Sequence, residues 1–276
     1  MKWLHFILSH SIFVAICAVA MAFQTVELLH LENNLFVYGF IFFATICSYN
    51  FYWILSKISF NTKASVMELL KKESTEIYLT ILSAVSLLLC LLNASIPISF
   101  VMVSILLTGL YSLPLLPIKF LLFTRKAGVL KTFILAITWV YVTAFIPLQK
   151  TYSLLNHADL FIISRRFLFM LMLCIIFDNR DMAVDKLRGL RSLATALKPA
   201  TLKLLIYLIF TILFATNFLF MHYGITIFQS LALQVSTLAL LVVYFFSTKK
   251  QGYLFYYFVV DGMMLFSALA TYIAGI

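Results

Sequence analysis

The chain has 276 residues, of which 64% are hydrophobic and only 11% are charged, and its mean hydropathy is +1.07. Soluble domains carry about 25% charged residues, so this composition excludes an ordinary soluble protein and indicates an integral membrane protein. The formal net charge is +10, but the basic residues lie in short loops between apolar segments. This distribution argues against nucleic-acid binding and in favour of a role in setting membrane topology.

Nine apolar segments follow one another along the chain, and each is long enough to cross a bilayer, which takes roughly 17 to 25 residues. They cover about residues 5–24, 35–56, 77–94, 96–117, 130–148, 160–177, 202–221, 225–246 and 254–274. No soluble domain or short repeat separates them. The sequence therefore predicts one polytopic domain over residues 1–276, an all-α integral membrane protein with nine transmembrane helices.

The basic residues also predict the orientation of the chain. Seventeen of the 20 fall at the N-terminus or in the second, fourth, sixth and eighth loops. This bias predicts a multi-pass protein of the cell or inner membrane with a cytoplasmic N-terminus and an external C-terminus. Arg165 and Arg166 lie within the sixth segment near its outer end, so we expect that helix to begin after them or their side chains to reach the interface.

Three aspartates stand where the sixth segment ends, in the stretch FDNRDMAVDKLRGLRSLAT of residues 177–195. In a helix, Asp178, Asp181 and Asp185 are spaced i+3 and i+4 and share one face. Carboxylates are costly near a bilayer, at about 2.5 to 3.5 kcal/mol in the centre of a span, so a compensating cation is expected. Mg²⁺ prefers carboxylate oxygens and completes its shell with water and phosphates. The alternative is a solvated loop whose acids and bases pair locally.

Basic side chains near these aspartates are candidates for holding a polyphosphate. One group belongs to the aspartate stretch itself and the other to the fourth loop, where a plain topological role is the alternative. The candidate phosphate-binding residues are Lys119, Arg125, Lys126, Lys131, Arg180 and Lys186.

The stretch DNRDMAVDKLRGLRSLAT resembles the second aspartate-rich motif of the UbiA-type intramembrane prenyltransferases, D-x-x-R-D-x-x-x-D followed by a basic residue, Gly and Thr. The stretch YSLPLLPIK, which begins at Tyr111, and the later RKAGVLKTFILAITW are similar to the family's segment between helices four and five. The family also has nine helices, a cytoplasmic N-terminus and polar cytoplasmic loops after the even-numbered helices. The resemblance implies a UbiA-like bundle with cytoplasmic cap loops.

The family's first motif, N-D-x-x-D-x-x-x-D at the end of helix two, is degenerate in this sequence. The matching stretch keeps Asn50, but its acidic positions hold Phe51, Ile54 and Ile58. In the family, the two motifs face each other and bind a diphosphate through two Mg²⁺ ions. The resemblance therefore assigns Asn50 to the metal or phosphate site beside the three aspartates, and an interhelical hydrogen bond is the alternative. Three outcomes are open: one metal with Lys and Arg suffices, the substrate differs, or the cavity persists without the chemistry.

Asp261 lies within the last apolar segment. A lone acid inside the membrane is a functional candidate by default. We expect it to orient an acceptor or to bind a cation such as Lys131 or Arg125, and a structural hydrogen bond is the alternative.

The sequence thus predicts a Mg²⁺-dependent prenyltransferase that moves a polyprenyl group from its diphosphate to a small acceptor, commonly an aromatic ring in the family. Its catalytic and metal-binding residues are Asp178, Asp181 and Asp185, and its substrate-binding residues are Asn50, Tyr111, Lys119, Arg125, Lys126, Lys131, Arg180, Lys186 and Asp261. The alternative is a non-catalytic isoprenoid- or lipid-binding membrane protein on the same scaffold. A transporter is disfavoured, because no pair of helices is broken by Gly or Pro. The residues indicate no particular oligomeric state.

Overall fold

The computed structural model describes residues 2–60, 73–112, 128–150, 154–187 and 191–276, and all regular structure in these ranges is helical. This confirms the all-α prediction. The helices are α1 (Lys2–Ser9), α2 (Ile12–Leu28), α3 (Leu35–Phe60), α5 (Ser74–Ala94), α6 (Ile98–Ser112), α7 (Gly128–Val140), η3 (Tyr141–Phe145), α8 (Ile146–Leu148), α9 (His157–Leu187), α10 (Leu193–Ala196), α11 (Pro199–Leu219), η5 (Phe220–Tyr223), α12 (Ile227–Ser247), η6 (Phe255–Val260) and α13 (Asp261–Ile273). Two of these, η3 and η6, are π-helices, and η5 is a 3₁₀ helix.

Within the described residues, seven helical segments are long and apolar enough to cross a membrane, and the bent pair α1 and α2 would make an eighth. α6 is a shorter apolar helix, and it ends where the described range 73–112 ends. The structure therefore supports a multi-pass membrane protein. The count of nine transmembrane helices stays a prediction, and so do the cytoplasmic cap loops.

Two predicted segment boundaries are corrected. The first segment does not run straight from residue 5 to residue 24, because α1 and α2 meet at an angle of 67° and Ser11 between them has a left-handed φ of 63°. The sixth segment was expected to end at residue 177, but α9 continues to Leu187. The aspartate stretch is therefore helical over most of its length and is not an open loop.

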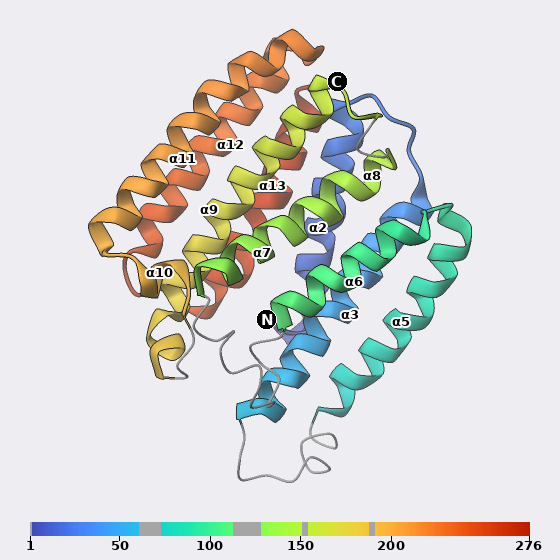
Figure 1. Cartoon of the computed structure of the whole chain (residues 1–276), viewed down its shortest axis with the longest axis vertical. Coiled ribbons are helices and arrows are strands. Elements are labelled where there is room, and N and C mark those ends of the chain that lie inside the picture. The colour runs from blue at the N-terminus through green and yellow to red at the C-terminus, as the bar shows by residue number, and fades with distance from the viewer. Residues whose placement is uncertain (1, 61–72, 113–127, 151–153, 188–190) are drawn as a thin grey trace.

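The helices form one bundle in which the C-terminal ends of α3 and α9 and the short α10 lie at the same end, the lower end in Figure 1. α9 is the most deeply buried of the described spans, with 61% of its most apolar stretch inside the bundle, whereas α5 has 11%. α5 packs chiefly along α3 at the edge of the bundle. Because α9 is central, residues at its C-terminal end are surrounded by several other helices.

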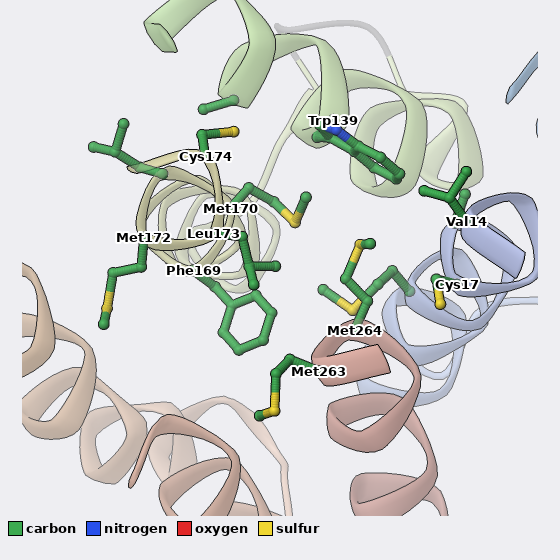
Figure 2. Packing of buried hydrophobic residues seen from close by; sticks show 14 of the residues in the cluster. Val14, Cys17, Trp139, Phe169, Met170, Met172, Leu173, Cys174, Met263 and Met264 are labelled. Carbon is green, nitrogen blue, oxygen red and sulfur yellow. The ribbon is translucent and has the colours of Figure 1, made fainter. Parts of the chain in front are cut away.

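The interior around α9 is rich in methionine and cysteine. Met170 of α9 points toward Trp139 of α7 and Met264 of α13 (Figure 2), and these side chains are buried, as are Cys174 of α9 and Cys17 of α2. Methionine is flexible and fills irregular space, so a core of this composition adapts its shape more readily than one of branched residues.

Arg165 and Arg166 lie elsewhere than expected. α9 begins before them, at His157, and neither side chain reaches the interface, because their exposed fractions are 2% and 0%. The Arg166 Nη1 group donates to the backbone carbonyl of Met21 at 2.7 Å, and its Nη2 group donates to Gln24 Oε1 at 3.0 Å. The Arg165 Nε group donates to Asn217 Oδ1 at 2.7 Å. Neutral acceptors inside the bundle hold both guanidinium groups in place.

The π-helix η3 takes part in this network. The carbonyl oxygen of Thr143 accepts from the hydroxyl of Thr25 at 2.8 Å and from Arg166 Nη1 at 3.4 Å. The hydroxyl of Thr25 also accepts from Arg166 Nη2 at 3.1 Å. Arg166 therefore ties α2 and η3 to α9 in the half of the bundle remote from the aspartates.

Candidate active site

The three aspartates of α9 lie on one helix, as their spacing predicted, but their carboxylates have different surroundings. Asp178 and Asp185 are buried, whereas the side chain of Asp181 is 43% exposed. Helical geometry explains why the three aspartates lie on one side of α9, since i+3 and i+4 spacing keeps residues on one face. The neighbouring helices account for the difference in exposure.

Asp178 of α9 is linked to α7 and α10 by hydrogen bonds. Its Oδ2 atom accepts a hydrogen bond from the Thr132 hydroxyl of α7 at 2.5 Å and from the Leu193 backbone N–H, the first residue of α10, at 3.2 Å. At the start of α10 the Ser192 backbone N–H donates to the Thr195 hydroxyl at 2.8 Å. Asp178 therefore has a structural role at the end of the bundle in addition to any role in binding.

Asp181 forms an ion pair with its neighbour Arg180. The Arg180 Nε and Nη2 groups donate to the two carboxylate oxygens at 2.6 and 2.7 Å, which is the strong bidentate geometry of an arginine and a carboxylate. The guanidinium carbon also lies 4.9 Å from the ring centre of Phe177, 5.3 Å from that of Tyr256 and 5.1 Å from that of Tyr257. These contacts hold Arg180 between α9 and η6.

Lys131 and two tyrosines complete this end of the bundle. The Lys131 Nζ atom lies 5.9 Å from the ring centre of Tyr111 in α6, and that ring stacks on Tyr52 of α3 with 5.0 Å between ring centres. Lys131 interacts electrostatically with Asp178, Asp181 and Asp185 and with Tyr52. The structure thus brings together an ammonium group, two phenols and three carboxylates from four helices, α3, α6, α7 and α9.

Tyr52 was not among the candidate residues, because the degenerate motif was aligned on Phe51. The structure shows that Phe51 is 52% exposed and that the neighbouring face of α3 is the one that meets Tyr111 and Lys131. Tyr49, one turn before Tyr52, packs against Trp139 of α7 with 6.2 Å between ring centres. The spacing of Tyr49, Tyr52 and Ser56, i, i+3 and i+7, was the signal in the sequence that could have identified this face.

Asn50 is buried, and its Oδ1 atom accepts a hydrogen bond from the Ser11 hydroxyl at 3.1 Å. This contact secures the bend between α1 and α2. The Asn50 amide nitrogen has no hydrogen-bond partner among the described residues.

Asp261 is the first residue of α13, directly after the π-helix η6, and it is buried. Its carboxylate interacts electrostatically with Arg180 and with Tyr49 and Cys174. Among the described residues the cation that interacts with it is therefore Arg180 and not Lys131, and Arg125, the other cation expected from the sequence, lies outside the described residues.

The remaining candidates do not add to this group within the described part of the chain. Lys186 is exposed in the last turn of α9. Lys119, Arg125 and Lys126 lie outside the described residues.

The carboxylates fit a Mg²⁺ ion that takes most of its ligands from substrate and water. No three His, Cys, Asp or Glu side chains of the described residues converge on one point where they would hold a metal by themselves. Mg²⁺ does not require such a cage, because one or two carboxylates with waters and substrate phosphates are its usual protein environment. Asp181 and Asp185 lie on adjacent turns of one helix, and both interact electrostatically with Lys131, so they are the pair that would hold the ion.

No protein-family model and no curated protein matches the sequence. The three-dimensional arrangement nevertheless defines a class, because the chain has the UbiA-type prenyltransferase fold. It superposes on the apo structure of a UbiA homolog from Aeropyrum pernix K1 with a TM-score of 0.59 and 13% identity, over 95% of this chain and 97% of that one. It superposes on a digeranylgeranylglyceryl phosphate synthase with a TM-score of 0.53 and 14% identity, over 97% and 95%. These likenesses confirm the fold that the aspartate motif implied.

Proposed function

We propose that the chain is an intramembrane prenyltransferase that moves a polyprenyl group from its diphosphate to a small acceptor. The observation that carries this proposal is the convergence of Lys131, Tyr52 and Tyr111 with the aspartates of α9 at one end of a UbiA-type bundle. An ammonium group and two phenols donate hydrogen bonds of the kind that phosphate oxygens accept. We place this end of the bundle at the cytoplasmic surface, with the C-terminus outside.

In the proposed donor complex, Lys131, Tyr52 and Tyr111 bind the diphosphate, and Asp181 and Asp185 would hold a Mg²⁺ ion between protein and substrate. The bound ion would supply positive charge to the leaving oxygens. Arg180 keeps the Asp181 carboxylate in one orientation through its two hydrogen bonds. The buried methionine, cysteine and aromatic side chains around α9 accommodate the prenyl chain and keep water from the allylic carbon.

A second candidate, a non-catalytic isoprenoid-binding protein, is favoured by the absence of any acidic residue from α3. It is also favoured by the engagement of Asp178 and Asp181 with protein partners. The two candidates differ in turnover, because both bind a prenyl diphosphate but only the first breaks its C–O bond.

The test is calorimetric binding of geranylgeranyl diphosphate to the purified protein, with and without Mg²⁺, together with the release of diphosphate from the same ligand in the presence of a set of small aromatic acceptors. For Lys131→Met we expect weaker binding by roughly 10- to 150-fold, since a hydrogen bond to a charged group contributes about 1.5 to 3 kcal/mol. The matched control is Lys203→Met, because Lys203 also lies over a tyrosine, 5.7 Å from the ring centre of Tyr207, but on an exposed part of α11.

The possible results separate the two candidates. Mg²⁺-dependent binding with diphosphate release, both weakened in Lys131→Met and unchanged in Lys203→Met, supports the transferase. Binding without release supports the non-catalytic protein. If the wild-type protein binds no prenyl diphosphate, both candidates are wrong.

A further inference from the structure

Arg165 and Arg166 are adjacent positive charges inside the bundle, and no acidic side chain of the described residues compensates them. Every acceptor that they reach is a neutral amide, hydroxyl or carbonyl oxygen, and no ion pair of the described residues includes either one. Of the ten acidic residues in the chain, nine are described and only Glu68 lies outside the described ranges. Because a guanidinium group stays protonated in proteins, both charges persist.

The acidic residue nearest to the pair along α9 is already neutralised. Asp159 accepts hydrogen bonds from Lys150 Nζ at 3.1 and 2.8 Å, and it precedes Arg165 by six residues, which is about 9 Å along a helix. Glu32 is exposed beyond the end of α2. Neither carboxylate offsets the charge of the arginines.

Glu27 of α2 faces a different helix. It interacts electrostatically with Tyr38 of α3, and Phe23, one turn earlier on the same face of α2, packs against the Tyr38 ring with 6.2 Å between ring centres. The residue of α2 that meets Arg166 is instead Thr25, whose hydroxyl accepts from Nη2 at 3.1 Å. α2 therefore offers the arginines dipoles and turns its carboxylate toward α3.

Two N–H groups of the pair also lack an acceptor. Arg165 Nη2 and Arg166 Nε are buried and have no hydrogen-bond partner among the described residues. A buried donor without an acceptor is destabilising, and a buried charge without a counter-charge is more so. A water molecule would supply an acceptor but no charge. A bound anion supplies both.

The surroundings restrict the size and the source of such an anion. The exposed fractions of Arg165 and Arg166 are 2% and 0%, so a lipid headgroup at the membrane surface does not contact them. Asp178 lies twelve residues beyond Arg166 on α9, or about 18 Å, so a diphosphate bound beside the aspartates does not reach them either. A single small anion fits these enclosed surroundings.

We propose that Arg165 and Arg166 form a binding site for a small monovalent anion, chloride being the common example, and that this anion stabilises the bundle. It accepts hydrogen bonds from the N–H groups that lack an acceptor and offsets one of the two charges. The site is separate from the cluster at the end of α9, and the inference does not depend on the proposed prenyltransferase function.

The experiment measures the unfolding temperature by circular dichroism in detergent as chloride replaces gluconate at constant ionic strength. Gluconate is too large for an enclosed site. A ligand that binds only the folded protein raises the unfolding temperature, here by about 5 to 11 °C when its concentration is 100 times Kd. Equilibrium binding of radiolabelled chloride should give one ion per chain.

Three variants locate the effect. Arg165→Met should abolish both the shift and the binding of labelled chloride. Asn217→Asp places a carboxylate where Arg165 Nε now donates to an amide oxygen at 2.7 Å, so it should weaken chloride binding about 10-fold or more by removing one net positive charge. Its matched control is Asn217→Ser, which loses the same amide without adding charge and should keep the chloride dependence.

The exposed cation Lys203 of α11 provides a second control, since Lys203→Met should respond to chloride as the wild type does. Equal unfolding temperatures of the wild type in chloride and in gluconate overturn the inference. So does a shift of full size in folded Arg165→Met, or an Asn217→Asp protein that binds chloride as tightly as Asn217→Ser. One labelled ion per wild-type chain, together with none in Arg165→Met, supports it.

Discussion

The hydrogen bond between Thr132 and Asp178 gives a quantitative prediction for Thr132→Val. Valine has nearly the shape of threonine, so the change removes the hydroxyl group and leaves Asp178 Oδ2, among the described residues, with only the Leu193 N–H at 3.2 Å as a donor. Thr132 is 1% exposed, so water does not take the place of the lost donor. Since a hydrogen bond to a charged group contributes about 1.5 to 3 kcal/mol, the free energy of unfolding should fall by about that amount.

For a chain of this size the loss corresponds to a decrease of roughly 3 to 12 °C in the unfolding temperature. A thiol-reactive fluorophore measures it in a fixed detergent once the partly exposed Cys47 and Cys90 have been replaced by alanine, because Cys17 and Cys174 are buried and free and react only as the bundle opens. The control is Thr211→Val, whose hydroxyl bonds to the Tyr207 carbonyl of its own helix in an exposed position. Equal unfolding temperatures for Thr132→Val and wild type would refute the conclusion that the hydrogen bonds of Asp178 to α7 and α10 stabilise the bundle.

Two further changes test the rest of the structure. Arg166→Met removes the donors to Met21 and Gln24, so it should lower the unfolding temperature more than Thr132→Val does. The affinity of the folded variant for geranylgeranyl diphosphate should stay unchanged. A loss of affinity would contradict a purely structural role for Arg166. Tyr52→Phe removes one phenol hydroxyl from the proposed diphosphate site and should raise the Kd measured by calorimetry roughly 2- to 13-fold, the equivalent of about 0.5 to 1.5 kcal/mol. An unchanged Kd would exclude Tyr52 from the site.

Features that depend on local periodicity and composition were predictable from the sequence. The membrane character follows from long apolar segments, and the shared face of Asp178, Asp181 and Asp185 follows from helical geometry alone. Lys131 was predicted as a phosphate-binding residue as part of the basic group of the fourth loop, and in the structure it interacts electrostatically with all three aspartates. Whether it binds phosphate stays a prediction.

Features that depend on how helices dock were not predictable. The partners of Asp178 come from α7 and α10, and no spacing in the sequence relates them to α9. Arg165 and Arg166 looked misplaced in an apolar segment because their acceptors are carbonyl and amide oxygens, which leave no charge pattern in the sequence. The face of α3 that carries Tyr52 was missed for a different reason: the alignment followed the family motif, and the motif is absent.

The charges at the candidate site explain why a single divalent ion is a reasonable requirement here. Among the described residues, the carboxylates of Asp178, Asp181 and Asp185 carry three negative charges, and the cations that pair or interact with them, Arg180 and Lys131, carry two positive charges. The net charge of these five side chains is −1, and Asp261, which also interacts with Arg180, makes it more negative when ionised, so the site repels a diphosphate. One Mg²⁺ ion raises the net charge of the five side chains to +1, which favours diphosphate binding. A second acidic cluster on α3 would call for a second ion to reach the same balance, and with tyrosines there instead, one ion is enough.

Binding of prenyl diphosphate should therefore need Mg²⁺ but show a stoichiometry of one ion per chain, and calorimetric titration of Mg²⁺ into the protein with bound diphosphate measures it directly. Two equivalent ions per chain would contradict this charge argument.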